Sequence, residues 1–149
     1  METIIKVASL QEMDRFAKTI SEHVFPGAIV GLTGELGSGK TTFTKFLAAH
    51  LNINDTVTSP TFTILKVYPG KLPLYHMDVY RLEGIGYDYE LDDFIYGSGV
   101  SVIEWASYIR EMLPNEMLEI DISGNFDNER IIRVKGSGVY EKCIQALSH

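Results

Sequence analysis

The sequence is poor in cysteine and contains no long apolar run. Its 149 residues include one cysteine, Cys143, so an intramolecular disulfide is excluded and a zinc or iron–sulfur site lacks its thiols. No stretch approaches the roughly 18 apolar residues of a membrane-spanning helix. Residues 1–15 carry acidic side chains where a secretory signal requires a basic region and then an apolar one. We therefore expect a protein of the reducing cytoplasm with no membrane partner.

Positive charge is also scarce. Thirteen Lys and Arg stand against 20 Asp and Glu, which gives a net charge of −7. This balance argues against autonomous nucleic-acid binding by phosphate neutralisation, so a role on nucleic acid would need a protein partner. Hydrophobic residues make up 45 % of the chain and charged residues 22 %, a composition that supports a packed core. The length predicts one domain over 1–149.

Local patterns place a buried strand between two helices near the N-terminus. Ser9 and Glu12 have the spacing of a capping box, and apolar residues at helical spacing follow, which predicts a helix over 9–24. The short apolar run 28–33 predicts a strand that is covered on both faces. Apolar residues recur at helical spacing again over 40–51, so strand, glycine-rich turn and helix are consecutive.

The rest of the chain alternates strand and helix patterns. Strands are predicted over 62–68, 74–79 and 100–104, a helix over 106–113, a hairpin over 118–122 and 131–135, and a last helix over 139–147. Residues 83–99 contain four glycines and several acids, and we interpret them as a surface loop, with a lid as the alternative. These elements predict one mixed α/β domain.

The glycine-rich turn carries a phosphate-binding motif. Residues 34–41 read Gly-Glu-Leu-Gly-Ser-Gly-Lys-Thr, a full match to G-x-x-x-x-G-K-[ST] between a strand and a helix. Backbone N–H groups of such a turn bind phosphate oxygens, Lys40 would reach the β- and γ-phosphates, and the Thr41 hydroxyl would bind Mg²⁺. The predicted fold is therefore α/β, a three-layer P-loop NTPase-type fold with a central mixed, mainly parallel sheet and a C-terminal β-hairpin plus helix.

Two carboxylates end apolar strands where ligands bind in open α/β sheets. Asp78 ends one predicted strand and Glu104 ends the next; one would hold Mg²⁺ and the other would orient the attacking water, and the sequence leaves the assignment open. We interpret His76 as a residue that packs at a strand end and Trp105 as a core or interface residue. Neither joins the predicted catalytic set.

The segment 58–62 lies between the loop helix and the next strand. P-loop proteins often place a γ-phosphate sensor there, and Thr61 or Ser59 has the required hydroxyl. A rigid turn built on Pro60 is an equally good interpretation of the same residues.

Three further segments follow the loop in a fixed order. They are Ser59-Pro60-Thr61-Phe62, His76-Met77-Asp78-Val79-Tyr80-Arg81-Leu82 and Val102-Ile103-Glu104-Trp105. With residues 34–42 they resemble the bacterial TsaE ATPases, over most of residues 9–113. Those proteins are required for the threonylcarbamoyladenosine modification of tRNA beside the anticodon. The resemblance implies an ATP-binding, Mg²⁺-dependent ATPase that is weak alone and stimulated by the TsaB–TsaD pair, with tRNA engaged only through that complex.

The resemblance also implies roles for individual positions. Nucleotide contacts fall on Gln11, Gly34, Glu35, Leu36, Gly37, Ser38, Gly39, Lys40, Thr41 and Thr42. The implied catalytic set is Lys40, Asp78, Glu104 and Thr61, with Thr61 as γ-phosphate sensor. Magnesium is assigned to Glu104, beside Thr41 and Asp78. The match is loose over 84–89, and Glu90 stands where many relatives have glycine.

Other functions fit parts of the same pattern. A small-metabolite or nucleoside kinase also pairs a phosphate loop with strand-end carboxylates, but it generally needs a basic lid, and no arginine cluster occurs here. A GTPase is disfavoured because an Asn-Lys-x-Asp segment for guanine is missing. A nucleotide-binding adaptor that never hydrolyses would keep Lys40 and Thr41 but would not need Asp78 and Glu104.

Overall fold

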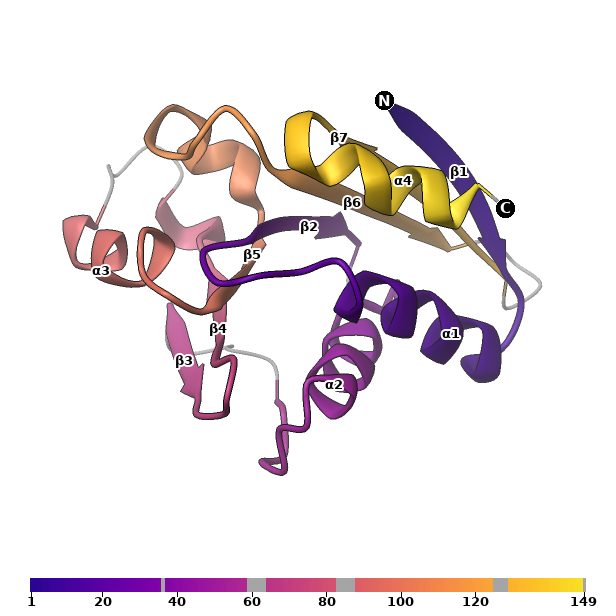
Figure 1. Cartoon of the computed structure of the whole chain (residues 1–149), viewed down its shortest axis with the longest axis horizontal. Helices are drawn as coiled ribbons and strands as arrows, with labels where there is room; N and C mark the ends of the chain where they lie inside the picture. Colours follow the sequence, from indigo (N-terminus) through magenta and orange to yellow (C-terminus); the bar gives the residue numbers. More distant parts are fainter. Residues whose placement is uncertain (36, 59–63, 83–87, 125–128, 149) are drawn as a thin grey trace.

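The computed structural model describes residues 1–35, 37–58, 64–82, 88–124 and 129–148. They form a seven-stranded sheet in the order β1-β7-β6-β2-β5-β4-β3 (Figure 1). The strands are β1 (Glu2–Val7), β2 (Ile29–Gly34), β3 (Leu65–Tyr68), β4 (Leu74–Asp78), β5 (Val100–Glu104), β6 (Leu118–Gly124) and β7 (Arg130–Gly136). The central strands β4, β5, β2 and β6 run parallel, whereas β3, β7 and β1 are antiparallel to their neighbours. This confirms the predicted α/β class and the C-terminal hairpin.

Helices cover both faces of the sheet. The α-helices are α1 (Leu10–Ser21), α2 (Lys40–His50), α3 (Asp92–Ile95) and α4 (Glu141–Leu147), and the 3₁₀ helices are η1 (Tyr80–Leu82), η2 (Tyr89–Leu91), η3 (Ala106–Met112) and η4 (Gly138–Tyr140). The predicted cap holds, because the Ser9 side chain accepts from the backbone N–H of Glu12. Among the described helices, none combines the length and apolarity needed to cross a bilayer.

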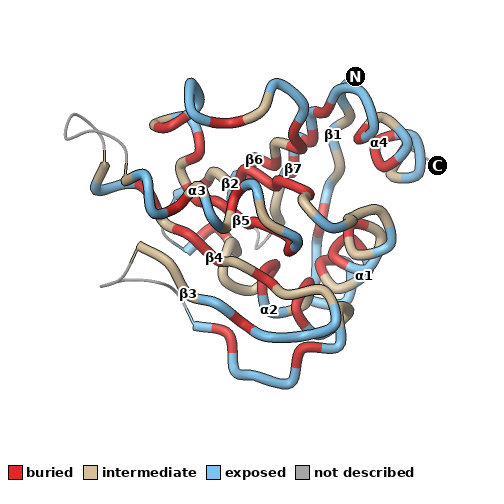
Figure 2. Tube along the Cα trace, turned by 60° about the vertical axis from the view of Figure 1, so that its left-hand side comes forward, coloured by how far each residue is buried: buried red, intermediate tan, exposed pale blue. Residues whose placement is uncertain are grey.

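Two apolar clusters form the core, one on each face. Val30 and Leu32 of β2 pack in the cluster that includes side chains of α1, α2 and α4, whereas Ile29 packs in the cluster under η3. Figure 2 shows the central strands as largely buried. Because both faces are covered, β2 reads as a nearly continuous apolar run, and every residue of β5 is buried, including the polar Ser101 and Glu104.

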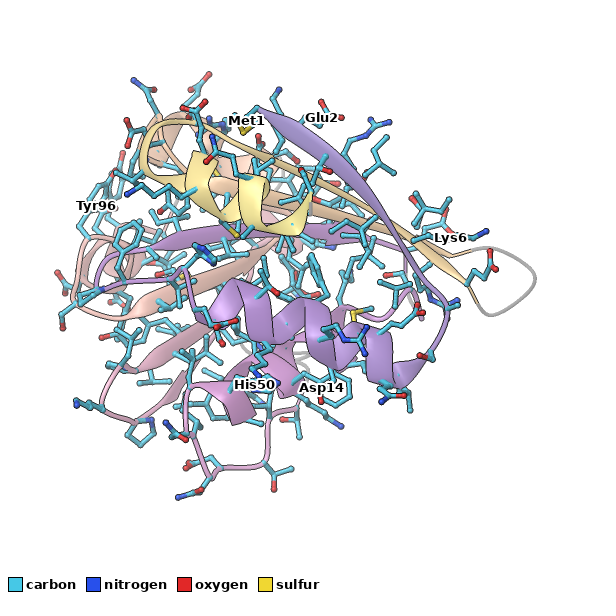
Figure 3. All side chains as sticks on the ribbon, turned by 45° about the vertical axis from the view of Figure 1, so that its right-hand side comes forward. Met1, Glu2, Lys6, Asp14, His50 and Tyr96 are labelled. Carbon is cyan, nitrogen blue, oxygen red and sulfur yellow. The ribbon has the colours of Figure 1, made fainter. Side chains whose placement is uncertain are left out.

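Helices α1 and α2 lie side by side on the face of the sheet to which Val30 and Leu32 point, as Figures 1 and 3 show. The rings of Phe16 and Phe43 meet between them with centroids 5.5 Å apart. At the surface, His50 Nε2 lies 2.6 Å from Asp14 Oδ1, and Figure 3 shows this pair joining the two helices. The pair ties the first half of α1 to the C-terminal end of α2.

Three segments differ from the predictions made from the sequence. The segment 2–7 was not predicted as a strand, but it forms β1 on the antiparallel edge, where only one face meets the core. The interpretation of 83–99 as a surface loop is wrong over 89–95, which form η2 and α3 and bury Leu91 and Ile95. The predicted helix over 106–113 is the 3₁₀ helix η3, and residues 62–63 of the predicted strand 62–68 lie outside the described residues.

Candidate functional site

The carboxyl ends of three parallel strands meet at one edge of the sheet. Glu104 at the end of β5 is the register partner of Leu32 on β2 and of Asp78 at the end of β4. The turn after β2 therefore lies beside both strand-end carboxylates. Open α/β sheets bind their ligands at such edges.

The turn between β2 and α2 has the backbone of a phosphate cradle. Gly37 and Gly39 have φ of 81° and 115°, which residues with a side chain rarely adopt. At Gly34 the reason for glycine is space, because a Cβ there would lie 2.6 Å from both the Ile122 carbonyl oxygen and Ser38 Oγ. Ser38 Oγ is buried and has no partner among the described residues.

Helix α2 begins without the groups that usually neutralise a helix start. Its N-cap is Gly39, which offers no side-chain hydrogen bond, and its first turn contains no acidic residue. The first N–H groups of this helix and the positive end of its dipole are therefore left for an anion. Together with the glycine turn, this geometry fits the phosphate groups of a nucleotide.

Lys40 and Glu104 face each other across this edge. Lys40 Nζ lies 3.4 Å from Glu104 Oε1, and both side chains are largely buried. The same ammonium lies 5.0 Å from the ring centroid of Trp105. Two predicted catalytic residues, far apart in the sequence, are thus brought into direct contact, with an aromatic ring beside them.

Glu104 has a second partner that sequence reasoning missed. His76 is fully buried, and its Nε2 lies 2.7 Å from Glu104 Oε2. Burial by itself raises the pKa of the Glu104 carboxyl, but the hydrogen bond and charge of His76, followed by Lys40, outweigh burial and lower it. Glu104 is therefore a carboxylate at neutral pH.

The alternation of side chains along a strand, in which every second residue points to the same face, is the sequence signal that places His76 near Glu104. Residues paired in register point to the same face, so Asp78 lies on the face of Glu104, and His76, two residues earlier, shares that face. The prediction that His76 packs at a strand end holds for its burial but omits its bond to Glu104. Asp78 accepts a hydrogen bond at Oδ1 from the Tyr80 backbone N–H and remains partly exposed.

A cleft of about 240 Å³ opens beside the loop on the β6 side. Its lining residues are Thr33, Gly34, Glu35, Trp105, Asp121, Ile122, Ser123 and Gly124. Trp105 has φ of 63°, so the chain turns sharply after β5, and its ring stacks on Tyr108. The predicted role of Trp105 in packing is thus combined with a position on the wall of the cleft.

The remaining predicted residues occupy different places. Thr41 and Thr42 lie in the first turn of α2, half buried. Gln11 is exposed in the first turn of α1; two residues on, Met13 Cε lies 3.4 Å from where a Cβ on Gly39 would stand. Leu36 and Thr61 lie outside the described residues.

No group of three or more His, Cys, Asp or Glu that could hold a metal ion occurs within the described ranges. Magnesium in nucleotide sites is usually held by one or two carboxylates together with phosphate oxygens and water. The ionised Glu104 beside a phosphate cradle fits that mode of binding.

Comparison with known proteins identifies the family. The model of the family described as threonylcarbamoyl adenosine biosynthesis protein TsaE matches residues 7–132. The chain belongs to the TsaE family. Among TsaE relatives, the tRNA threonylcarbamoyladenosine biosynthesis protein TsaE of Bacillus subtilis is 47 % identical over 140 residues, which are 93 % of this chain and 89 % of the relative. The protein of the same name from Treponema pallidum is 41 % identical over 128 residues, which are 85 % and 95 % of the two chains.

A solved structure agrees with the TsaE assignment. The crystal structure of Bacillus subtilis YdiB matches with a TM-score of 0.84 and 40 % sequence identity, covering 99 % of this chain and 95 % of that one. Membership of the TsaE family supports a role in tRNA threonylcarbamoyladenosine biosynthesis. The resemblance stated from the loop, Ser-Pro-Thr, Asp-Val-Tyr-Arg and Glu-Trp segments is thereby confirmed.

Proposed function

We propose that this TsaE-family chain is an ATP-binding, Mg²⁺-dependent ATPase that acts in the threonylcarbamoyladenosine modification of tRNA. The observation that carries the proposal is the contact of Lys40, at the end of a phosphate loop, with the ionised carboxylate of Glu104. Family membership supports the pathway, and the site geometry supports the chemistry.

The loop and the start of α2 bind the phosphates. Backbone N–H groups around Gly37 and Gly39 and the uncapped helix start supply the donors, and Lys40 neutralises the β- and γ-phosphates. Gln11, at the exposed start of α1, contacts the nucleotide from the side of that helix. This set holds the phosphates in place before any bond changes.

The carboxylates supply the second half of the site. Glu104, with the Thr41 hydroxyl and Asp78, would hold magnesium, which when bound neutralises charge that develops on the phosphates. Asp78 would also orient the attacking water, a role that is supported by its position on the face of Glu104 and by its partial exposure. His76 keeps Oε2 of Glu104 engaged, so Oε1 faces the Lys40 side.

The net charge and the family support the partners that we propose. With a net charge of −7, the chain acts on a protein complex that already holds tRNA and does not bind RNA alone. We assign TsaB and TsaD as that complex, in the cytoplasm, and Thr61 as the γ-phosphate sensor through which hydrolysis responds to them.

The test is phosphate release from Mg²⁺-ATP by the purified chain, with Lys40→Ala as the matched control. A slow release that the variant loses supports an intrinsic ATPase. Transfer of phosphate to a small molecule in a metabolite screen, without release to water, would instead support the kinase alternative.

A further inference from the structure

We propose that Arg130 is a positioning residue that holds the phosphate loop in its anion-binding shape. This inference rests on the proposed nucleotide-binding function. Arg130 Nε donates to the Ser38 carbonyl oxygen at 2.7 Å, and its Nη2 donates to the Gly37 carbonyl oxygen at 3.4 Å. Neither the phosphate-loop motif nor the strand-end pattern involves this residue.

Two successive carbonyls of the loop are thus fixed by one guanidinium. In a planar trans peptide the C=O and the N–H of the same unit point in opposite directions. Holding Ser38 O toward Arg130 therefore aims the N–H of Gly39 away from it, and holding Gly37 O fixes the N–H of Ser38, which donates to Glu35 O at 3.0 Å. Both units adjoin glycines at positive φ, where the backbone has most freedom to rotate.

Arg130 is itself firmly anchored. It is the first residue of β7 and is paired on one side with Val7 of β1 and on the other with Gly124 of β6. A third donor, Nη1, binds the Glu129 carbonyl oxygen at 3.1 Å, and the Glu129 side chain pairs with Lys6 at 3.1 Å. Figure 3 shows Lys6 at this end of the β6–β7 hairpin. The sheet therefore anchors Arg130, which holds the Ser38 carbonyl from a position 92 residues away in the sequence.

The planar guanidinium of arginine suits this task better than the ammonium of lysine. The guanidinium reaches two carbonyls at once, whereas an ammonium would reach them less directionally. The same strand offers a matched control, because Arg133 pairs with Glu2 at the surface and has a 60 % exposed side chain. Replacement of Arg133 removes a positive charge from β7 without touching the loop.

The experiment compares wild type, Arg130→Lys, Arg130→Ala and Arg133→Ala by calorimetric titration with ADP and with adenosine. We expect Arg130→Ala to weaken ADP binding about tenfold or more, since hydrogen bonds from a charged donor are lost. Arg130→Lys should restore only part of the affinity, and Arg133→Ala should bind as wild type does. Adenosine, which has no phosphate, should bind all four proteins alike. ADP binding by Arg130→Ala equal to that by Arg133→Ala, or an equal loss of adenosine binding, would overturn the inference.

A second measurement separates this inference from the proposed function. Amide hydrogen exchange of residues 37–40 is followed in the nucleotide-free proteins, with thermal unfolding as a check of folding. Arg130→Ala should exchange these amides at least about tenfold faster while the strands of the sheet stay protected. Unchanged exchange overturns the positioning role of Arg130 even if the wild-type protein binds nucleotide. If Arg130→Ala exchanges faster but the wild-type protein binds no nucleotide, the positioning role of Arg130 is supported and the proposed function is overturned.

Discussion

His76 donates a hydrogen bond from Nε2 to Oε2 of Glu104 at 2.7 Å, from a ring that solvent does not reach. The other oxygen of that carboxylate faces Lys40 Nζ at 3.4 Å. A buried carboxylate with partners on both oxygens has little rotational freedom. The pair thus fixes the direction in which Glu104 presents its charge.

Substitution of His76 tests that relationship. His76→Leu removes the donor, and we expect Mg²⁺-dependent hydrolysis to fall about tenfold or more, because a hydrogen bond to a charged group contributes roughly 1.5–3 kcal/mol. His76→Gln keeps a donor and should recover part of the rate. The measurement is the Mg²⁺ concentration at half-maximal rate, together with thermal unfolding. Equal Mg²⁺ dependence in wild type and both variants would show that His76 only packs.

Two glycines of the loop should respond differently to alanine. At Gly34 a Cβ meets a backbone oxygen at 2.6 Å, so we expect Gly34→Ala to lower the free energy of unfolding by about 1–3 kcal/mol. At Gly37 there is open space for a Cβ, but φ is 81°. Gly37→Ala should therefore lower the free energy of unfolding by about 1–2 kcal/mol through backbone strain alone. Denaturant unfolding measures both. A Gly34→Ala protein as stable as wild type would mean that the tight approach of Gly34 to Ile122 is absent.

The strand-end carboxylates should affect turnover more than binding. We expect Asp78→Asn and Glu104→Gln to lower hydrolysis by about a hundredfold or more while ATP affinity stays within a few fold, the size of effect that a positioned catalytic group has. Lys40→Ala, in contrast, should lose nucleotide binding. Initial rates and calorimetry on the three variants separate these effects. A wild-type rate in either carboxylate variant would remove that residue from the catalytic set.

Cys143 predicts a pH dependence of stability at the alkaline end. Burial raises the pKa of its thiol from 9.0 to about 11. Since the folded thiol holds its proton more tightly than the unfolded one, its contribution to stability is complete below pH 9 and declines as the pH rises from 9 to 11. Urea unfolding across this range should show a steeper decline in wild type than in Cys143→Ala. Parallel profiles of the two proteins would contradict the shift.

Much of the fold was predictable from local patterns. The phosphate loop is a contiguous motif, and the largely apolar sequences of β2 and β5 follow from burial on both faces. The strand β1 was missed because only one of its faces meets the core, so its pattern of burial is weak. The short helix α3 was missed because glycines and acids surround the two buried residues that anchor it and η2, Leu91 and Ile95.

The site was predictable only where its residues act through local sequence. Lys40, Asp78 and Glu104 each follow from a strand end or a motif. The contacts of His76 with Glu104 and of Arg130 with Ser38 join strands and turns far apart in the sequence, and only the register of the sheet brings them together. Strand alternation puts His76 on the same face as Asp78 but does not identify its partner, and Arg130 carries no local signal of its contact with Ser38.

The central claim is a partner-stimulated ATPase of tRNA modification. It is tested most directly by ATP hydrolysis with Mg²⁺, first by the chain alone and then with purified TsaB, TsaD and tRNA, while threonylcarbamoyladenosine in the tRNA is measured in parallel. We predict slow hydrolysis alone, strong stimulation by the complex, and tRNA modification that fails when Lys40→Ala replaces the wild type. Equal hydrolysis with and without the complex, and modification that proceeds equally with Lys40→Ala, would contradict the account.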